Sequence, residues 1–145
     1  MIQNPLFLFY RMESPKNTLC KAERLNSKKS IELLFDGNSY SLGAYPLRAV
    51  FLTVEKLDGE APVSIMISVP KKKFKRAVKR NRIKRQIREA YRKNKHQLTD
   101  LLVEKNKRLL IAFIFMDNKL YDSGEIENKL KVLLNRIRER LEKDG

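Results

Sequence analysis

Cysteine, histidine and tryptophan are scarce in this sequence. Its 145 residues include one cysteine (Cys20), one histidine (His96) and no tryptophan. One cysteine cannot form an internal disulfide, and with a single histidine it cannot supply the ligands of a His/Cys zinc site. No stretch approaches the ~20 consecutive apolar residues that a membrane-spanning helix needs. These absences argue against a disulfide-stabilised secreted scaffold, a zinc finger, a serine–histidine hydrolase and a membrane protein.

Acidic residues are also in deficit. The chain has 17 Asp and Glu against 32 Lys and Arg, which gives a formal net charge of +15 and a pI near 10.1. Residues 71–95 contain 14 basic residues and one acid, a net charge of +13, so the other 120 residues contribute only +2. A local excess of this size indicates a polyanionic partner, most simply a nucleic acid. The alternative is a solvated helix face or a localisation tag.

Hydrophobic periodicity divides the chain into seven predicted elements. Alternating apolar residues predict strands, whereas apolar residues three and four apart predict helices. Gly37 is typical of a helix stop, Asp58-Gly59 of a turn, and the segment 122–125 of a capping box. The predicted elements are a helix over 27–35, a short strand over 39–42, strands over 47–56 and 62–69, a helix from about 76 to about 105, a strand over 108–116 and a helix from about 122 to about 143.

This order predicts an α+β fold in which helices cover a small sheet. The run 109–116 is continuously apolar, as is typical of a buried central strand. The two long helices each carry one apolar stripe that we expect to face the sheet. The stripes consist of Ile83, Ile87, Ala90 and Tyr91 on the first helix and Ile126, Leu130, Leu133, Leu134, Ile137 and Leu141 on the second.

We expect one domain over residues 18–145, preceded by a flexible N-terminal extension over residues 1–17. The short apolar stretch 6–10 has no basic region before it and no small-residue cleavage site, which argues against a signal peptide. Met12 is an alternative start. Without a secretion signal, the protein is expected in the cytoplasm.

The basic segment forms a ridge when it is placed on a helix of 3.6 residues per turn. Arg80, Lys84, Arg88 and Arg92 follow one another at i, i+4 spacing, and Asn81 lies in the same polar arc. Their rise of about 6 Å per step is close to the phosphate spacing of a nucleic-acid strand, and arginine can bond two phosphate oxygens at once. The ridge lacks a dense Asn/Gln set, which favours phosphate contacts over base contacts.

Residues that could perform chemistry are few. Glu89 is expected to pair with Arg85 or Arg92 and so to orient an arginine. A protein nuclease would need clustered carboxylates to hold Mg²⁺, and here the acids are scattered. Asp117 and Asp122 flank a loop, where a turn and capping role is favoured over metal binding. We therefore predict no catalytic residue and no metal ligand on the protein, and His96 is expected to be a surface residue.

Residues 68–92 read SVPKKKFKRAVKRNRIKRQIREAYR. This string resembles the bacterial ribonuclease P protein subunit, whose pattern Ala-Val-x-Arg-Asn-Arg-x-Lys-Arg-x-x-Arg-Glu-Ala-aromatic-Arg it matches position by position. The similarity extends over roughly residues 21–140 and includes Glu23-Arg24-Leu25 before the first helix. Two departures are Lys73-Phe74, where many members have Val-Gly, and Ile31, where members often carry an aromatic residue.

The resemblance implies an α/β sandwich (an α+β fold) of ribosomal-protein-like type, with element order αβββαβα and a small mixed sheet. It also implies a left-handed β-α-β crossover through the basic helix, whereas such crossovers are usually right-handed. It also implies a protein subunit of a ribonucleoprotein endoribonuclease. In that family the RNA subunit, which requires Mg²⁺, hydrolyses precursor tRNA to give the mature 5′ end. The implied partners are the catalytic RNA and precursor tRNA, with no DNA and no membrane.

The family pattern also implies the binding residues. The cleft between the first helix and the open sheet face would hold the single-stranded 5′ leader, with Phe35 and Ile31 as leader contacts. Ordinary packing of these two residues against the sheet is the alternative. The residues expected to bind RNA are Lys71, Lys72, Lys75, Arg76, Lys79, Arg80, Asn81, Arg82, Lys84, Arg85, Arg88 and Arg92.

Three other functions remain open. A non-catalytic RNA-binding module would show the same ridge without an effect on tRNA processing. A DNA-binding protein would prefer a duplex and place a helix in its major groove. A protein nuclease would cleave without any RNA subunit.

Overall fold

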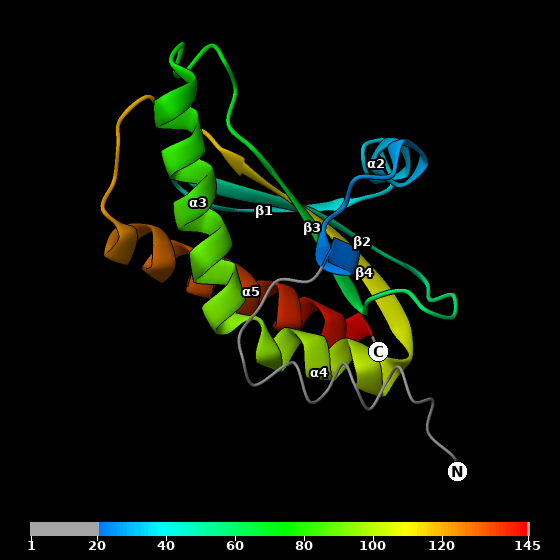
Figure 1. Ribbon diagram of the computed structural model, residues 1–145. Coiled ribbons are helices and arrows are strands. Elements are labelled where there is room, and N and C mark those ends of the chain that lie inside the picture. Colours follow the sequence, from blue (N-terminus) through cyan, green and yellow to red (C-terminus); the bar gives the residue numbers. More distant parts are fainter. Residues whose placement is uncertain (1–20, 145) are drawn as a thin grey trace.

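The computed structural model describes residues 21–144; the predicted extension over 1–17, Met12 and Cys20 lie outside this part. A 3₁₀ turn comes first and is followed by helices and strands in the predicted order, with one additional helix (Figure 1). The elements are η2 (Lys21–Glu23), α2 (Lys28–Leu34), β1 (Tyr40–Ala44), β2 (Leu47–Glu55), β3 (Val63–Ser68), α3 (Ala77–Asn94), α4 (His96–Lys105), β4 (Lys107–Phe115) and α5 (Ser123–Asp144).

Local signals define the helix ends, as predicted at Gly37 and at residues 122–125. The Ser27 hydroxyl accepts a hydrogen bond from the Ser30 N–H at 3.4 Å, which caps α2, and Gly37 follows that helix with a φ of 103°. At the start of α5, Asp122 Oδ1 accepts a hydrogen bond from the Glu125 N–H at 2.8 Å. These contacts satisfy backbone groups that a helix end otherwise leaves without partners.

The four strands form a mixed sheet in the order β1-β2-β4-β3. β1 and β2 form an antiparallel hairpin, β2 pairs antiparallel with β4, and β3 pairs parallel with β4. The turn at Gly59 (φ 84°) therefore joins two strands that are not neighbours, because β4 lies between them. The chain passes from β3 to the parallel strand β4 through α3 and α4, which confirms the β-α-β crossover; its left-handed sense stays a prediction.

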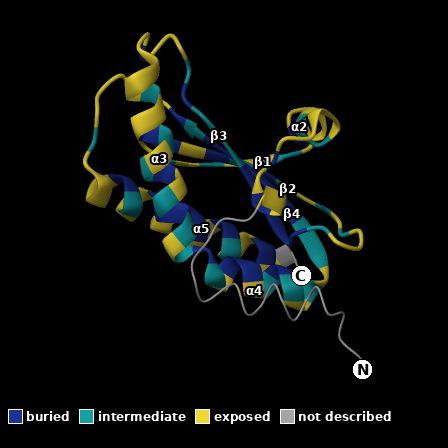
Figure 2. Ribbon diagram, in the orientation of Figure 1, coloured by how far each residue is buried: buried dark blue, intermediate teal, exposed yellow. Residues whose placement is uncertain are grey.

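Helices cover the two faces of the sheet unequally. The main core lies between one face and α3, α4 and α5, and all ten predicted stripe residues of α3 and α5 are buried in it. On the other face, Leu25 and Leu34 form a small cluster with Leu110 and Ala112 of β4. Figure 2 shows this asymmetry, with α2 exposed over most of its surface. The second face is therefore only partly covered.

The single helix predicted from about 76 to about 105 is wrong, because the chain breaks at Lys95 into α3 and α4. A continuous helix of that length would span about 45 Å, whereas the nine-residue strand β4 spans only about 30 Å. The break allows α4 to turn and bury Leu98 and Leu102 in the core. Beside it, Lys95 Nζ donates to both carboxylate oxygens of Glu23, at 3.0 and 2.9 Å.

Within the described residues, no helix is both long and apolar enough to cross a membrane.

Candidate nucleic-acid interface

One face of α3 is a cationic surface. Its opposite face carries Ile83, Ile87 and Tyr91 into the core, which fixes the orientation of the helix on the sheet. In the part of the chain that the structure describes, no carboxylate forms an ion pair with the exposed Arg82, Arg85 or Arg88. We call the exposed basic residues that lack an ion pair, in the preceding loop and in α3 as far as Arg88, the basic surface. They are Lys71, Lys72, Lys73, Lys75, Arg76, Lys79, Arg82, Arg85 and Arg88.

The loop before α3 is held by an aromatic anchor. Phe74 is buried, and its ring centroid lies 6.0 Å from that of Phe115 at the end of β4. Arg80 Nη1 donates to the carbonyl oxygens of Phe74 and Lys75, at 2.7 and 2.8 Å. Phe74 thus anchors the loop at a position where the sequence departs from the family pattern. Arg80, predicted to bind RNA, has one guanidinium nitrogen committed to loop backbone.

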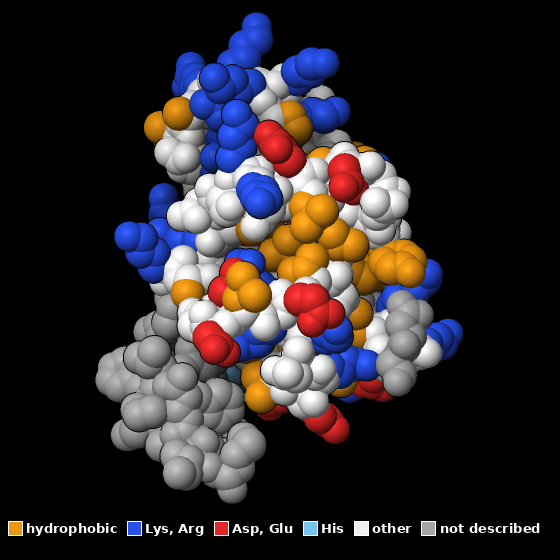
Figure 3. Space-filling model, turned by 90° about the vertical axis from the view of Figure 1, so that its right-hand side faces the viewer, with side chains coloured by type: hydrophobic (Ala, Val, Ile, Leu, Met, Phe, Trp, Pro, Cys, Tyr) orange, Lys and Arg blue, Asp and Glu red, His pale blue; other side chains and the backbone are white. Residues whose placement is uncertain are grey.

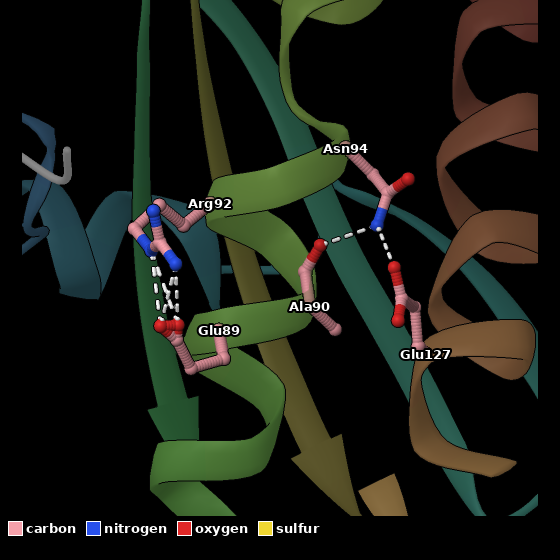
Figure 4. A network of polar contacts seen from close by, with 5 residues as sticks. All are labelled: Glu89, Ala90, Arg92, Asn94 and Glu127. Atoms are coloured by element: carbon pink, nitrogen blue, oxygen red, sulfur yellow. Dashed lines mark hydrogen bonds and ion pairs between the residues drawn. The ribbon is translucent and has the colours of Figure 1, made fainter. Parts of the chain in front are cut away.

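Arg92 differs from the other ridge arginines because its charge is paired. Its Nε and Nη2 donate to the Glu89 carboxylate at 2.7–3.1 Å (Figure 4). These hydrogen bonds lower the pKa of Glu89 and raise the pKa of Arg92. The predicted pairing of Glu89 with Arg92 is confirmed. Of the remaining predicted contacts, Asn81 is exposed and Lys84 half-buried on the same helix.

The partly covered sheet face is apolar next to α2. Phe35, at the C-cap of α2, is 50% exposed, whereas Ile31 is partly buried against the small cluster under the helix. The structure thus places Ile31 in a packing contact and leaves Phe35 accessible. Sequence reasoning did not name the other apolar residues of this face, although their alternation along the strands marks one side of the sheet. They are Val50, Leu52, Val54 and Met66, all half-buried.

The basic surface and an apolar area lie on the same side of the molecule. In Figure 3, Lys and Arg side chains gather at the top, where Figure 1 places the loop between β3 and α3, and an apolar area lies below them. Such a combination can hold a phosphate backbone by charge while bases contact apolar side chains.

Asp117 and Asp122 have structural partners. Asp117 is buried; its carboxylate accepts hydrogen bonds from the Tyr121 hydroxyl and, at 2.7 Å, from the Asn118 N–H. The Tyr121 hydrogen bond lowers the pKa of Asp117 and raises that of Tyr121 to about 12. No group of three or more His, Cys, Asp or Glu residues within 21–144 is arranged to hold a metal ion. His96 lines a shallow depression between α4 and α5 together with Lys93 and Lys131.

The pKa of Asp117 is lower in the folded protein than in the unfolded chain, where it is about 3.9. The hydrogen bonds of the Asp117 carboxylate therefore stabilise the fold at pH values above about 3.9. This stabilisation is lost as the pH falls from there through the pKa of the folded state. Replacing Tyr121 with Phe returns the pKa of Asp117 toward normal. We expect Tyr121→Phe to be less stable than wild type near neutrality, and the difference to narrow below about pH 4. Urea unfolding at several pH values measures this; a difference constant from neutral to acid pH would contradict it.

The ribonuclease P family model matches residues 19–138. The chain belongs to the ribonuclease P protein family. A ribonuclease P protein component from Porphyromonas gingivalis (strain ATCC BAA-308 / W83) is 42% identical over 126 residues, covering 85% of this chain and 88% of the relative. Another, from Chlorobium phaeobacteroides, is 38% identical and covers 61% of each chain. Membership of this ribonuclease P family implies an RNA partner.

Solved ribonuclease P proteins share the fold. The Thermotoga maritima protein is 26% identical with a TM-score of 0.61, covering 79% of this chain and 96% of that one. A Staphylococcus aureus RNase P protein mutant with defective mRNA degradation activity is 22% identical with a TM-score of 0.60, covering 93% and 98%. The predicted family and the α+β fold are confirmed.

Proposed function

We propose that this chain is the protein subunit of ribonuclease P that binds the catalytic RNA through the basic surface and assists removal of the 5′ leader from precursor tRNA. The observation that carries the proposal is the set of nine exposed, unpaired cations on α3 and its anchored loop, in a member of this family. Chemistry is assigned to the RNA subunit with its Mg²⁺. The protein contributes no catalytic side chain and holds no metal.

The physical role of the basic surface is to offset repulsion between two RNAs. A rigid helix keeps these cationic side chains close together before RNA binds, and each phosphate contact releases condensed counterions. A holoenzyme containing this subunit should therefore fold and capture its substrate at lower Mg²⁺ than the RNA alone.

The apolar sheet face is assigned to the leader. Phe35 offers an accessible aromatic ring on which a base can stack, and the strand residues beside α2 form an apolar floor. Ile31 supports this face through its packing against Leu34 and the sheet.

The first test is precursor-tRNA cleavage at low Mg²⁺ with the protein alone, the cognate catalytic RNA alone and both together. Cleavage mainly in the mixture supports the proposal. Tight, salt-sensitive RNA binding without any gain over the RNA alone would favour a non-catalytic RNA-binding module. Cleavage by the protein alone would indicate a nuclease, and preference for duplex DNA in competition would indicate a DNA-binding protein.

Two arginine variants separate binding from loop positioning. Arg88→Ala removes an exposed, unpaired guanidinium, so we expect about five- to tenfold weaker binding to the catalytic RNA with an unchanged melting temperature. Arg80→Ala should weaken binding and also lower the melting temperature, because it frees the carbonyls of Phe74 and Lys75. Filter binding and thermal denaturation measure both effects.

Lys143→Ala is the matched control, since it removes an exposed charge at the end of α5, far from the loop in Figure 1. Unchanged RNA affinity in both Arg80→Ala and Arg88→Ala would remove the ridge from the mechanism.

A further inference from the structure

The tip of the β1–β2 hairpin presents an exposed aromatic ring beside a buried carboxylate. Tyr45 is 60% exposed, and desolvation of its hydroxyl together with the neighbouring Asp117 carboxylate raises its pKa. The Asp117 carboxylate accepts hydrogen bonds from the Tyr121 hydroxyl and the Asn118 N–H. The ring of Tyr45 is therefore open to a ligand, whereas the carboxylate beside it already has hydrogen-bond partners within the fold.

Cations surround this tip. Arg136 Nη1 of α5 donates to the carbonyl oxygen of Gly43 at 2.7 Å, and Arg48 is the cross-strand partner of Gly43. The Arg48 Nε donates to the Ser41 hydroxyl at 2.7 Å, and Lys119 lies two residues after Asp117. Three cations therefore lie near the tip, where the Asp117 carboxylate already accepts hydrogen bonds from Tyr121 and Asn118, so the tip is suited to an anionic chain.

An apolar residue is exposed next to the tip. The Met116 N–H donates to the carbonyl oxygen of Pro46 at 2.8 Å, which places Met116 next to the tip, and 38% of Met116 is exposed. A methionine beside an aromatic ring adds a polarisable surface that fits the flat face of a base.

The tip lies at the same end of the sheet as the basic surface. Gly43, Arg48, Ile114 and Ser68 are register partners across the four strands, and the loop before α3 begins just after Ser68. At about 4.8 Å per strand, the tip is about 15 Å from the end of β3. For an extended, unstacked strand with about 6 Å between successive phosphates, that span corresponds to about two or three nucleotides.

We propose that Tyr45 is a stacking platform for one base of a single-stranded RNA segment whose phosphates continue onto the basic surface. The inference rests on the proposed function and adds a contact outside the ridge and the α2 face. The segment belongs either to the catalytic RNA or to the precursor leader; in both cases the chemistry recognised is an unpaired base flanked by phosphates. An alanine at this position removes the platform, and one stacked base corresponds to about a five- to 100-fold change in affinity.

The test uses the absence of tryptophan from the chain. In Tyr45→Trp, the fluorescence reports only on this site, and a base stacked on the indole quenches it. Leu57→Trp is the matched control, because Leu57 is 66% exposed and follows the opposite end of β2. We expect quenching on addition of the catalytic RNA or of precursor tRNA for Tyr45→Trp, and little change for Leu57→Trp.

Affinity measurements with three RNAs identify the source of the base. Weaker binding of Tyr45→Ala to the catalytic RNA alone assigns the base to that RNA. A loss confined to the holoenzyme with leader-bearing precursor, and absent with mature tRNA, assigns it to the leader. Tyr45→Phe keeps the ring, so it should bind within a few-fold of wild type.

Two results would overturn the inference: unquenched Tyr45→Trp fluorescence at saturating RNA, or an equal loss of affinity in Tyr45→Phe and Tyr45→Ala. If Arg88→Ala weakens binding while Tyr45→Ala does not, the stacking platform fails and the proposed function stands. If the wild-type protein does not bind the catalytic RNA, the proposed function itself fails.

Discussion

Replacing Lys95 with alanine is expected to lower the free energy of unfolding by about 3–5 kcal/mol. The Lys95 and Glu23 side chains are only 3% and 2% exposed, and Nζ lies 2.9 Å from Oε2. Removing the lysine leaves a carboxylate buried without its main counter-charge, which costs far more than the net gain from forming the pair. Chemical denaturation at neutral pH measures the effect.

Lys107→Ala is the control for this prediction. It breaks an ion pair of shorter distance, 2.6 Å to Glu55, whose two side chains are 42% and 82% exposed. Solvent screens such a pair, so we expect a loss below about 1 kcal/mol. The contrast tests burial, because distance alone would rank the two pairs in the opposite order.

A double replacement separates the cost of a lone charge from the value of the pair. Replacing both partners with apolar residues, Lys95→Met and Glu23→Leu, removes the unpaired charge, so stability should return to near the wild-type value. A double variant as unstable as Lys95→Ala would show that the ion pair itself holds the turn between α3 and α4.

Local patterns were sufficient for most of the fold. Period-two alternation located β3, the apolar stripes identified the buried faces of α3 and α5, and the signals at Gly37 and at residues 122–125 marked a helix end and a helix start. The break at Lys95 could not be predicted in this way, because its partner Glu23 lies 72 residues away in sequence. The position of β4 between β2 and β3 is likewise decided by long-range pairing.

The candidate site also combines features that local sequence predicts with features that depend on long-range contacts. The composition and order of residues 71–92 predicted the cationic face of α3, because helix geometry alone brings those side chains together. Phe74, read from sequence only as a departure from a family pattern, acts through its contact with Phe115 on a distant strand. The exposed ring of Tyr45 was not singled out from sequence, because its neighbours at residues 116 and 117 are brought to it only by pairing of the strands.

The affinity for the catalytic RNA is expected to fall by about 10³–10⁵-fold between about 50 and 200 mM salt. The nine cations of the basic surface are consistent with about six to ten phosphate contacts, each of which adds nearly one unit to the slope of log affinity against log salt. Binding by a few base-specific contacts would give a much flatter line.

A triple variant, Arg82→Ala with Arg85→Ala and Arg88→Ala, tests which residues create that slope. All three side chains are exposed and unpaired within residues 21–144, so their removal should leave the fold unchanged. The slope should decrease by about three, which makes the loss of affinity over the same salt range about 50-fold smaller than for wild type. An unchanged slope would place the phosphate contacts on other residues, because counterion release depends on charges that meet the RNA and not on net charge alone.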